Sequence, residues 1–337
     1  MEGGGGGSSS GAAAGAAAMA AVAASPPAAG AAAASRSVSS SSSTVDTVYQ
    51  YDFGREVGAG LRIRERAPAQ HSLDDPACKA FREKASDDVT GWSVWASSVL
   101  LGHWLQASER AAALFSGCGG AGGGARVLEL GSGCGVAGLA AAVRRTAPPA
   151  AVTLSDLHAA TLDNLRHNVQ LNADAEVDAP AAAAAAGGDV TLRNGCRLRV
   201  ARMDWDDEST WPHAPGGGGV AQYDVVVAAD ATYKRSYARK LGVVVDATLA
   251  PGGTLVYASP AARDGLPLLR TILARAGYEV ADIEVPAGWR TNPLATSGGD
   301  PSVTYVADAD AAPLFPELFM SGYDFELFTA RRPVAAV

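Results

Sequence analysis

Residues 127–138 read VLELGSGCGVAG, and this stretch decides the fold. The apolar run at 127–130 predicts a short strand, and the pattern that follows predicts a helix over 136–145. The glycine turn between them lets a ligand approach the backbone closely, and the helix N-terminus beyond it offers free N–H groups. Taken alone, such a turn is equally consistent with a tight strand–helix connection.

Two phosphate-binding signatures are excluded by this turn. The dinucleotide fingerprint requires a third glycine three residues after the second, and this chain has Val136 there. A Gly-Lys-Ser/Thr triplet is absent from the sequence, so the turn is not a P-loop. A hydride-transfer enzyme that uses a nicotinamide dinucleotide is therefore disfavoured.

Strands and helices alternate on both sides of this stretch. Strands are expected at 127–130, 151–155, 198–203, 224–228, 254–258, 278–285 and 323–329. Helices are expected at 94–106 (extending to 115), 136–145, 159–171, 237–249 and 266–276. This alternation is typical of an α/β domain with one mostly parallel sheet, here of seven strands, and helices on both faces.

The domain is expected to be a single one that spans residues 46–333. At its start, aromatic and β-branched residues within 49–65 flank two glycines, which favours a β-hairpin. An Ala-rich insert at 173–196 and a long loop at 286–320 show no convincing pattern of a helix or a strand.

The first 45 residues consist mainly of Gly, Ala and Ser, which offer too little apolar area to form a core. We expect residues 1–45 to be a disordered low-complexity tail of a cytoplasmic protein. The alternative is a transit peptide that directs the chain to a plastid.

Composition excludes several classes of protein. The 337 residues are 48% hydrophobic and carry a formal net charge of −8, so the chain can bury a core and is neither collagen-like nor wholly disordered. An acidic chain is not expected to bind nucleic acid or an anionic membrane. The four cysteines, Cys78, Cys118, Cys134 and Cys196, match no zinc spacing and no disulfide framework. We therefore expect free thiols and no metal site. The protein is also expected to be a monomer.

A carboxylate follows the second expected strand of the sheet. Asp156 comes directly after 151–155, where it could accept two hydrogen bonds from the vicinal hydroxyls of a ribose. The alternative is a helix N-cap, a position that favours Asp. The glycine turn and this acid together predict a site for a nucleoside.

Five segments in this order resemble methyltransferase family 16, the seven-β-strand S-adenosylmethionine-dependent protein-lysine methyltransferases. Residues 127–138 look like motif I of such enzymes, and the other segments are Thr90-Gly91 with Val94-Trp95, 156–172, Met203-Asp204-Trp205 and Asp230-Ala231-Thr232-Tyr233. The D-x-x-Y motif at 230–233 is the most specific of them. The resemblance covers about residues 47–285 and implies a Rossmann-like class I methyltransferase fold with S-adenosylmethionine as its cofactor.

The resemblance also implies which residues bind the cofactor. They are Gly131, Ser132, Gly133 and Gly135 at its methionine end, Glu129 organising that loop, Asp156 and Leu157 at the ribose, Asp204 and Trp205 at the adenine, and Ala229, with Trp95 closing the pocket. For the two tryptophans the alternative role is packing in the core, which is the commoner one.

Asp230 and Tyr233 are the expected catalytic residues. They follow an apolar strand, at the carboxyl edge where ligands bind in open α/β sheets. A carboxylate and an aromatic ring could hold a lysine amine and align it, and Asp230 is expected to orient the amine rather than act as a strong base. The alternative is that Asp230 caps the following helix. Ala231-Thr232 departs from the bulkier aliphatic pair usual in this motif.

The sequence therefore predicts methyl transfer from S-adenosylmethionine to an accessible lysine of a protein substrate. A small-molecule N- or O-methyltransferase is the alternative on the same scaffold, because fold does not fix substrate. A catalytically inactive methyltransferase-fold binding protein is the alternative of another class, and the intact Asp230 and Tyr233 count against it.

Overall fold

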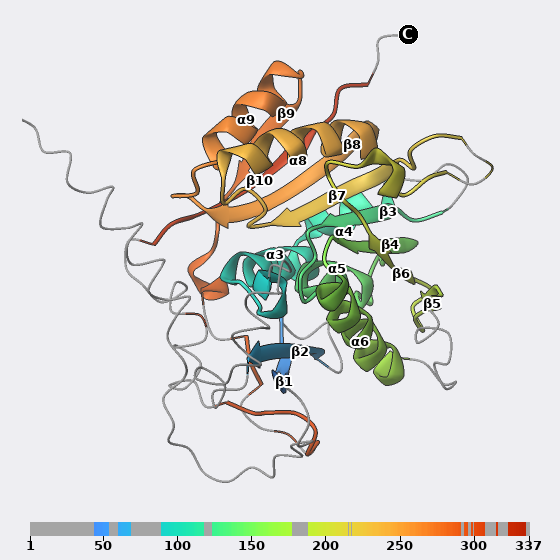
Figure 1. The fold of residues 1–337 in the computed structure, drawn as a ribbon, viewed down its shortest axis with the longest axis vertical. Helices are drawn as coiled ribbons and strands as arrows, with labels where there is room; N and C mark the ends of the chain where they lie inside the picture. Colours follow the sequence, from blue (N-terminus) through green and yellow to red (C-terminus); the bar gives the residue numbers. More distant parts are fainter. Residues whose placement is uncertain are drawn as a thin grey trace, which may run out of the picture.

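A computed structural model of the chain shows one large sheet with helices on both faces, and a separate two-stranded hairpin (Figure 1). The structure describes residues 44–53, 60–68, 89–117, 123–176, 188–214, 216, 218–290, 293–295, 298, 300–306, 315 and 323–334. The strands are β1 (Thr44–Tyr51), β2 (Leu61–Pro68), β3 (Arg126–Leu130), β4 (Ala151–Asp156), β5 (Val190–Thr191), β6 (Arg197–Arg202), β7 (Tyr223–Ala229), β8 (Leu249–Pro260), β9 (Glu279–Ile283) and β10 (Phe325–Arg331). The helices are α3 (Ala96–Ala107), α4 (Glu109–Ser116), α5 (Val136–Ala142), α6 (Ala159–Glu176), α8 (Arg235–Thr248) and α9 (Leu266–Arg275), with short 3-10 turns η2 (Val89–Trp92), η4 (Glu208–Thr210) and η6 (Ala287–Trp289).

The large sheet has the strand order β5-β6-β4-β3-β7-β8-β10-β9. The neighbours from β6 to β8 run parallel, whereas β10 runs antiparallel to both of its neighbours. The chain leaves β3 towards β4 on one side and returns as β7 on the other side of β3. In open α/β sheets, ligands bind at such a reversal, beyond the carboxyl ends of the strands.

Each face of the sheet buries alternate residues of its central strands. Val127 and Val225 pack in one core with α3, α5 and α6, whereas Leu128 and Val226 pack in a second core with α8 and α9. Figure 1 shows α8 and α9 on one side of the sheet and the other helices on the opposite side. Because both faces are covered, the central strands read as nearly continuous apolar runs.

All seven expected strands are present, but the sheet has an eighth, so the prediction of seven strands was wrong. The additional strand is β5, which lies within the expected insert at 173–196 and pairs antiparallel with β6. The turn between them contains Asn194-Gly195, and Gly195 has a φ of 87°. A strand of two residues is too short to show alternation. Residues 177–187 of the insert lie outside the described residues.

The expected helix at 94–106, extending to 115, is two helices rather than one. Ser108 has an extended conformation, with φ −85° and ψ 129°, which ends α3. Its hydroxyl accepts hydrogen bonds from the backbone N–H groups of Arg110 at 3.1 Å and Ala111 at 3.4 Å, so it caps α4.

The hairpin of β1 and β2 is attached to the domain by asparagines of α6. Asn164, Asn168 and Asn172 are spaced by four residues, so they share one side of the helix. Asn172 exchanges hydrogen bonds with the backbone N–H and C=O of Arg62, at 2.9 and 2.7 Å. Asn168 does the same with Arg64, at 2.8 and 3.2 Å. These amides satisfy the edge of β2 that β1 leaves unpaired.

Two described parts of the expected loop at 286–320, around Leu294 and Thr304, lie along the other edge of the hairpin. The Thr304 N–H donates to the Val48 carbonyl at 2.7 Å, and the Ala295 N–H donates to the Gln50 carbonyl at 2.8 Å. The hairpin therefore lies between α6 and this segment, which explains why two segments far apart in sequence are ordered together.

Several expectations fall on residues outside the described ranges. The expected tail at 1–45 is one of them, apart from Thr44 and Val45, which begin β1. Cys78 and Cys118 also lie outside, whereas Cys134 and Cys196 are buried free thiols. Among the described helices, none is both long and apolar enough to cross a membrane.

Candidate active site

A cavity of about 390 Å³ opens at the reversal between β3 and β7. Its walls come from the segment before α3, the glycine turn, the end of β4, the segment after β6, the loop after β7 and the turn after β8. Among the expected site residues, all except Gly135 line this cavity: Trp95, Glu129, Gly131, Ser132, Gly133, Asp156, Leu157, Asp204, Trp205, Ala229, Asp230 and Tyr233.

The glycine turn forms the floor of the cavity next to β4. Gly131 has a φ of 66°, in the left-handed region, and the ring of Trp205 lies over it. Gly135 has a φ of 84° and begins α5 behind the turn. A side-chain carbon at Gly135 would lie 2.5 Å from Leu165 Cδ1, so here the glycine is required by packing against α6.

Glu129 places a carboxyl group under the turn, almost completely out of contact with solvent. It is 2% exposed, and its Oε2 has no hydrogen-bond partner. Burial raises the pKa of Glu129 from 4.5 to about 8, and neighbouring Ser132 and Gly138 oppose this only in part. Near neutral pH this carboxyl is therefore protonated in the free protein, and a cationic group bound beside it would favour the ionised form.

Asp156 ties the end of β4 to the glycine turn. Its Oδ2 accepts the N–H of Gly133 at 3.0 Å, and its Oδ1 accepts the N–H groups of Leu157 at 2.8 Å and His158 at 3.4 Å. Burial raises the pKa of Asp156, and these three N–H groups oppose the rise. An ionised carboxylate offers about four lone-pair sites, so acceptor capacity remains for a ligand hydroxyl.

Asp204 and Trp205 form the wall beyond β6. The Asp204 carbonyl accepts the indole N–H of Trp211 at 2.7 Å, and its backbone N–H donates to the Thr210 hydroxyl at 2.8 Å. These contacts leave the ring of Trp205 half-buried beside Tyr237, with ring centres 6.4 Å apart. Trp95, on the other side of the cavity, donates its indole N–H to the Thr90 carbonyl at 2.9 Å.

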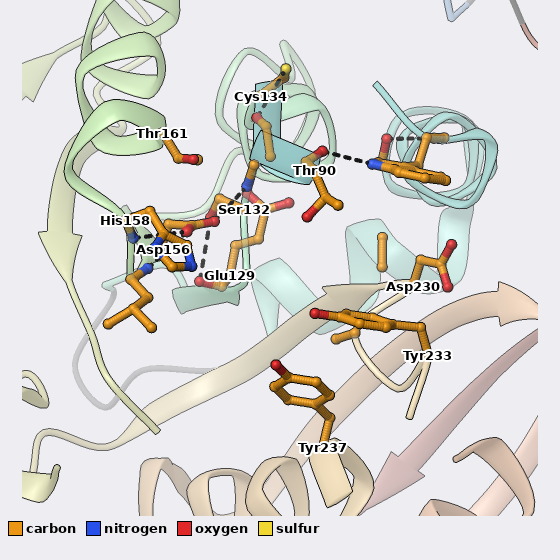
Figure 2. Close-up of a pocket in the computed structure, with 18 of the residues that line it drawn as sticks. Thr90, Glu129, Ser132, Cys134, Asp156, His158, Thr161, Asp230, Tyr233 and Tyr237 are labelled. Atoms are coloured by element: carbon orange, nitrogen blue, oxygen red, sulfur yellow. Dashed lines mark hydrogen bonds between the residues drawn. The ribbon is translucent and has the colours of Figure 1, made fainter. Parts of the chain in front are cut away.

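The D-x-x-Y loop occupies the end of the cavity beyond β7. Figure 2 shows Asp230, Tyr233 and Tyr237 across the cavity from Thr90 and Cys134. Tyr233 is 36% exposed, and its ring centre lies 4.8 Å from that of Tyr237. The expected alternative for Asp230, a helix cap, is wrong because α8 begins after Lys234, which occupies the N-cap position.

Asp230 itself is held in an ion pair that the sequence did not reveal. Its carboxylate accepts Arg263 Nε at 2.6 Å and Arg263 Nη2 at 2.5 Å, so the pair is bidentate. Its φ is +53°, which is uncommon for a residue with a side chain, and its N–H donates to the Ala258 carbonyl at 2.8 Å. Burial raises the pKa of Asp230, and Arg263 opposes that rise.

The structure gives a reason why Ala231-Thr232 stands in place of the bulkier aliphatic pair usual in the D-x-x-Y motif. Thr232 is fully buried, and its hydroxyl lies 2.6 Å from the hydroxyl of Tyr257 on β8. The same Tyr257 hydroxyl accepts the Thr232 backbone N–H at 3.1 Å. A polar side chain at this position therefore fastens the loop to β8.

The residues that the sequence did not predict include Tyr237, Lys240 and Arg263, which line the cavity, and Tyr257, which holds the D-x-x-Y loop. Tyr237 follows Tyr233 by four residues, a spacing that could have suggested a shared face. Lys240 forms an ion pair with Asp206, and both residues line the cavity. Arg263 and Tyr257 carried no local signal, because their partners, Asp230 and Thr232, lie far from them in sequence, in the loop after β7.

The sequence matches one known protein family. A sequence family described as lysine methyltransferase matches residues 74–265, which is more than half of the chain. A search of curated proteins gives no match.

Solved structures with similar folds are distant in sequence. A methyltransferase from Pyrococcus furiosus is 15% identical, with 63% of this chain and 77% of that chain covered and a TM-score of 0.37. An S-adenosylmethionine-dependent methyltransferase from Mesorhizobium loti is 19% identical, with 68% and 100% covered and a TM-score of 0.33. The ribosomal protein L11 methylase from Lactobacillus delbrueckii subsp. bulgaricus is 14% identical, with 62% and 70% covered and a TM-score of 0.34.

Proposed function

The chain belongs to the lysine methyltransferase family, and on that premise we propose that it methylates the side-chain amine of a lysine in a protein substrate. Because the chain belongs to this family, its reaction is methyl transfer and its cofactor is S-adenosylmethionine. The identity of the acceptor, a lysine on a protein, is the part that we propose.

The residues of the cavity fit this cofactor. The carboxyl group of Glu129, which lines the cavity, suits the amino group at its methionine end, and Asp156 has acceptor capacity left for a ribose hydroxyl. The ring of Trp205 offers a surface for the adenine. When bound, the cofactor supplies a methyl group activated by the adjacent sulfonium, so catalysis depends largely on positioning the acceptor.

The single observation that carries the proposal is the aromatic pair at the D-x-x-Y loop. The half-exposed ring of Tyr233 lies against Tyr237 at the cavity. The ammonium of Lys234 lies 5.8 Å from the centre of the Tyr233 ring. That contact supports the proposal because it is the geometry in which an aromatic face attracts an alkylammonium group.

In the reaction, the aromatic pair and Asp230 hold and align the lysine side chain. The amine must first lose its proton to solvent, because only the neutral nitrogen has a lone pair to form a new N–C bond. With the cofactor bound, that lone pair would take the methyl group, and the electrons of the methyl–sulfur bond would stay on sulfur.

The test begins with the full-length protein. Calorimetry with S-adenosylmethionine is expected to show binding that Asp156→Ala weakens. A radiolabelled-methyl screen of a cell lysate, followed by amino-acid analysis of labelled protein, is then expected to yield methyl-lysine. Asp230→Ala should abolish labelling, whereas Asp163→Ala, at an exposed position of α6, should leave it unchanged.

Other outcomes point to the alternatives. Label in small molecules alone would favour a small-molecule methyltransferase. Cofactor binding without any labelled product would favour an inactive binding protein. Absence of cofactor binding by folded protein would refute the proposed function.

A further inference from the structure

Arg263 and Asp230 both line the cavity, and they form a bidentate ion pair there. Both carboxylate oxygens accept a guanidinium N–H, at 2.6 and 2.5 Å. The side chains are 17% and 9% exposed, so solvent screens their charges little. A carboxylate in this arrangement is already neutralised before any substrate arrives.

That neutralisation changes what the site does to an approaching amine. An isolated carboxylate stabilises the ammonium form of a lysine and raises its pKa, which removes the nucleophile. A carboxylate paired with a guanidinium offers only its remaining lone pairs, and the nearby positive charge disfavours a second cation. The pair therefore accepts a neutral amine better than an ammonium ion.

We propose that Arg263 is a positioning residue of the methyl transfer, which neutralises Asp230 so that the acceptor lysine is held beside Tyr233 as a neutral amine. This inference rests on the proposed function, because it concerns the acceptor of that reaction. It assigns to Asp230 the task of orienting the amine through hydrogen bonding, without retaining the proton that must leave.

The backbone holds Arg263 in place for this task. The Arg263 N–H donates to the Pro260 carbonyl at 3.1 Å, which closes the turn after β8. Two residues later the Gly265 N–H donates to the Thr232 carbonyl, also at 3.1 Å, so the turn is joined to the D-x-x-Y loop. A side-chain carbon at Gly265 would lie 2.5 Å from that carbonyl, so the close approach requires glycine.

The other titratable groups around the pair come from neighbouring elements. Tyr257 of β8 and Tyr323 ahead of β10 face Arg263, and Glu129 of β3 lines the same cavity. Burial raises the pKa of Tyr257, so its hydroxyl is neutral at physiological pH. The ammonium of Lys234 lies 5.8 Å from the centre of the Tyr233 ring and adds positive charge, which also disfavours a bound ammonium.

The experiment compares wild type with Arg263→Gln, Arg263→Lys and the double variant Arg263→Gln/Asp230→Asn. n-Butylammonium, a mimic of the lysine side chain, is titrated into each protein saturated with S-adenosylhomocysteine. Arg263→Gln should bind it about tenfold more tightly or better, because the uncompensated carboxylate attracts the cation. Arg263→Lys should stay close to wild type, and the double variant should lose the gain.

A second readout is the pH dependence of methyl transfer to the labelled protein acceptor. Arg263→Gln should move the acid limb of the kcat profile upward by about one pH unit or more, because the bound amine holds its proton longer. A merely structural role would lower kcat at every pH without moving the limb. Unchanged n-butylammonium affinity in a folded Arg263→Gln that binds S-adenosylhomocysteine would overturn the proposal.

The two arms separate this inference from the proposed function. If wild type methylates no protein, the proposed function fails, while n-butylammonium binding still reports how Arg263 controls Asp230. If wild type methylates protein but Arg263→Gln shows neither tighter binding nor a shifted limb, only the role of Arg263 fails. If Arg263→Gln does not fold, the test uses Arg263→Lys and Asp230→Asn. The proposal then requires that Arg263→Lys binds n-butylammonium about as well as wild type and that Asp230→Asn binds it no more tightly than wild type.

Discussion

Replacement of Glu129 by glutamine tests the charge state of the buried carboxyl under the glycine turn. Glutamine keeps the shape of the side chain and cannot ionise. Glu129 is 2% exposed, its Oε2 has no hydrogen-bond partner, and burial raises its pKa to about 8. In the unfolded chain the same group titrates near 4.5.

The sign and size of the effect follow from this difference in pKa. Between pH 4.5 and 8 the unfolded chain has released the proton that the folded protein still holds, so the free energy of unfolding falls as pH rises. With 1.36 kcal/mol for each pKa unit, the loss due to Glu129 is about 2 to 3 kcal/mol between pH 5 and 7. Glu129→Gln should remove this loss.

The assay is urea unfolding followed by circular dichroism, at pH 5, 6 and 7, for wild type and Glu129→Gln. Glu65, whose pKa burial raises to about 7, titrates over the same range, so the wild-type curve alone does not isolate Glu129. The difference in unfolding free energy between the two proteins does isolate it, and should grow with pH in favour of the variant. A difference that stays constant from pH 5 to 7 would refute the reasoning.

Three further changes test the packing and the hydrogen bonds that shape the cavity. A methyl group added by Gly138→Ala would collide with Leu154, so urea unfolding should show a loss of about 1–3 kcal/mol, and an unchanged midpoint would contradict this packing. Glu65→Ala leaves the Val94 N–H without its acceptor at 3.1 Å and should weaken cofactor binding in calorimetry, whereas Glu65→Gln should restore it; equal affinities would exclude this support. Asn168→Ala removes two hydrogen bonds to β2 and should cost about 1–3 kcal/mol in denaturation, and a smaller loss than in a solvent-facing α6 variant would argue against the contact.

The main features of the fold could be predicted from the sequence because the central strands are buried on both faces. Such strands read as apolar runs, and the runs at 127–130 and 224–228 became β3 and β7 nearly unchanged. β5 was missed because two residues give no period, although Asn194-Gly195 is a recognised hairpin signal. The break at Ser108 was missed because apolar spacing continues across it into α4.

The candidate site could be predicted only where a residue directly follows a strand. Asp156 and Asp230 come at the ends of β4 and β7, and parallel pairing brings such ends to one edge. Arg263 could not be found in this way. It reaches Asp230 because Ala229 pairs with Ala258 on β8, a register that local patterns do not encode. The resemblance to the family placed Gly135 among the cofactor-binding residues. In the structure Gly135 does not line the cavity and packs against Leu165 of α6 instead.

The cavity also depends on residues outside the segment that matches the family, 74–265. Before that segment, Glu65 of β2 accepts the N–H of Val94, and Val94 lines the cavity next to Trp95. Glu65 can reach Val94 because the asparagines of α6 hold the edge of β2. The hairpin is therefore part of the wall that closes the site.

The C-terminal end contributes in a different way. β10 lies between β8 and β9, so without it the edge of β8 would expose unpaired N–H and C=O groups. The residues that follow β8 are those that carry Arg263, and the Ala261 N–H donates to the Asp324 carbonyl at 2.9 Å, just before β10. The last strand thus fixes the turn that neutralises Asp230. A protein reduced to residues 74–265 would keep both Asp230 and Arg263, but it would lose the pairing of β8 with β10 and the hydrogen bond from Ala261 to Asp324 that support the turn.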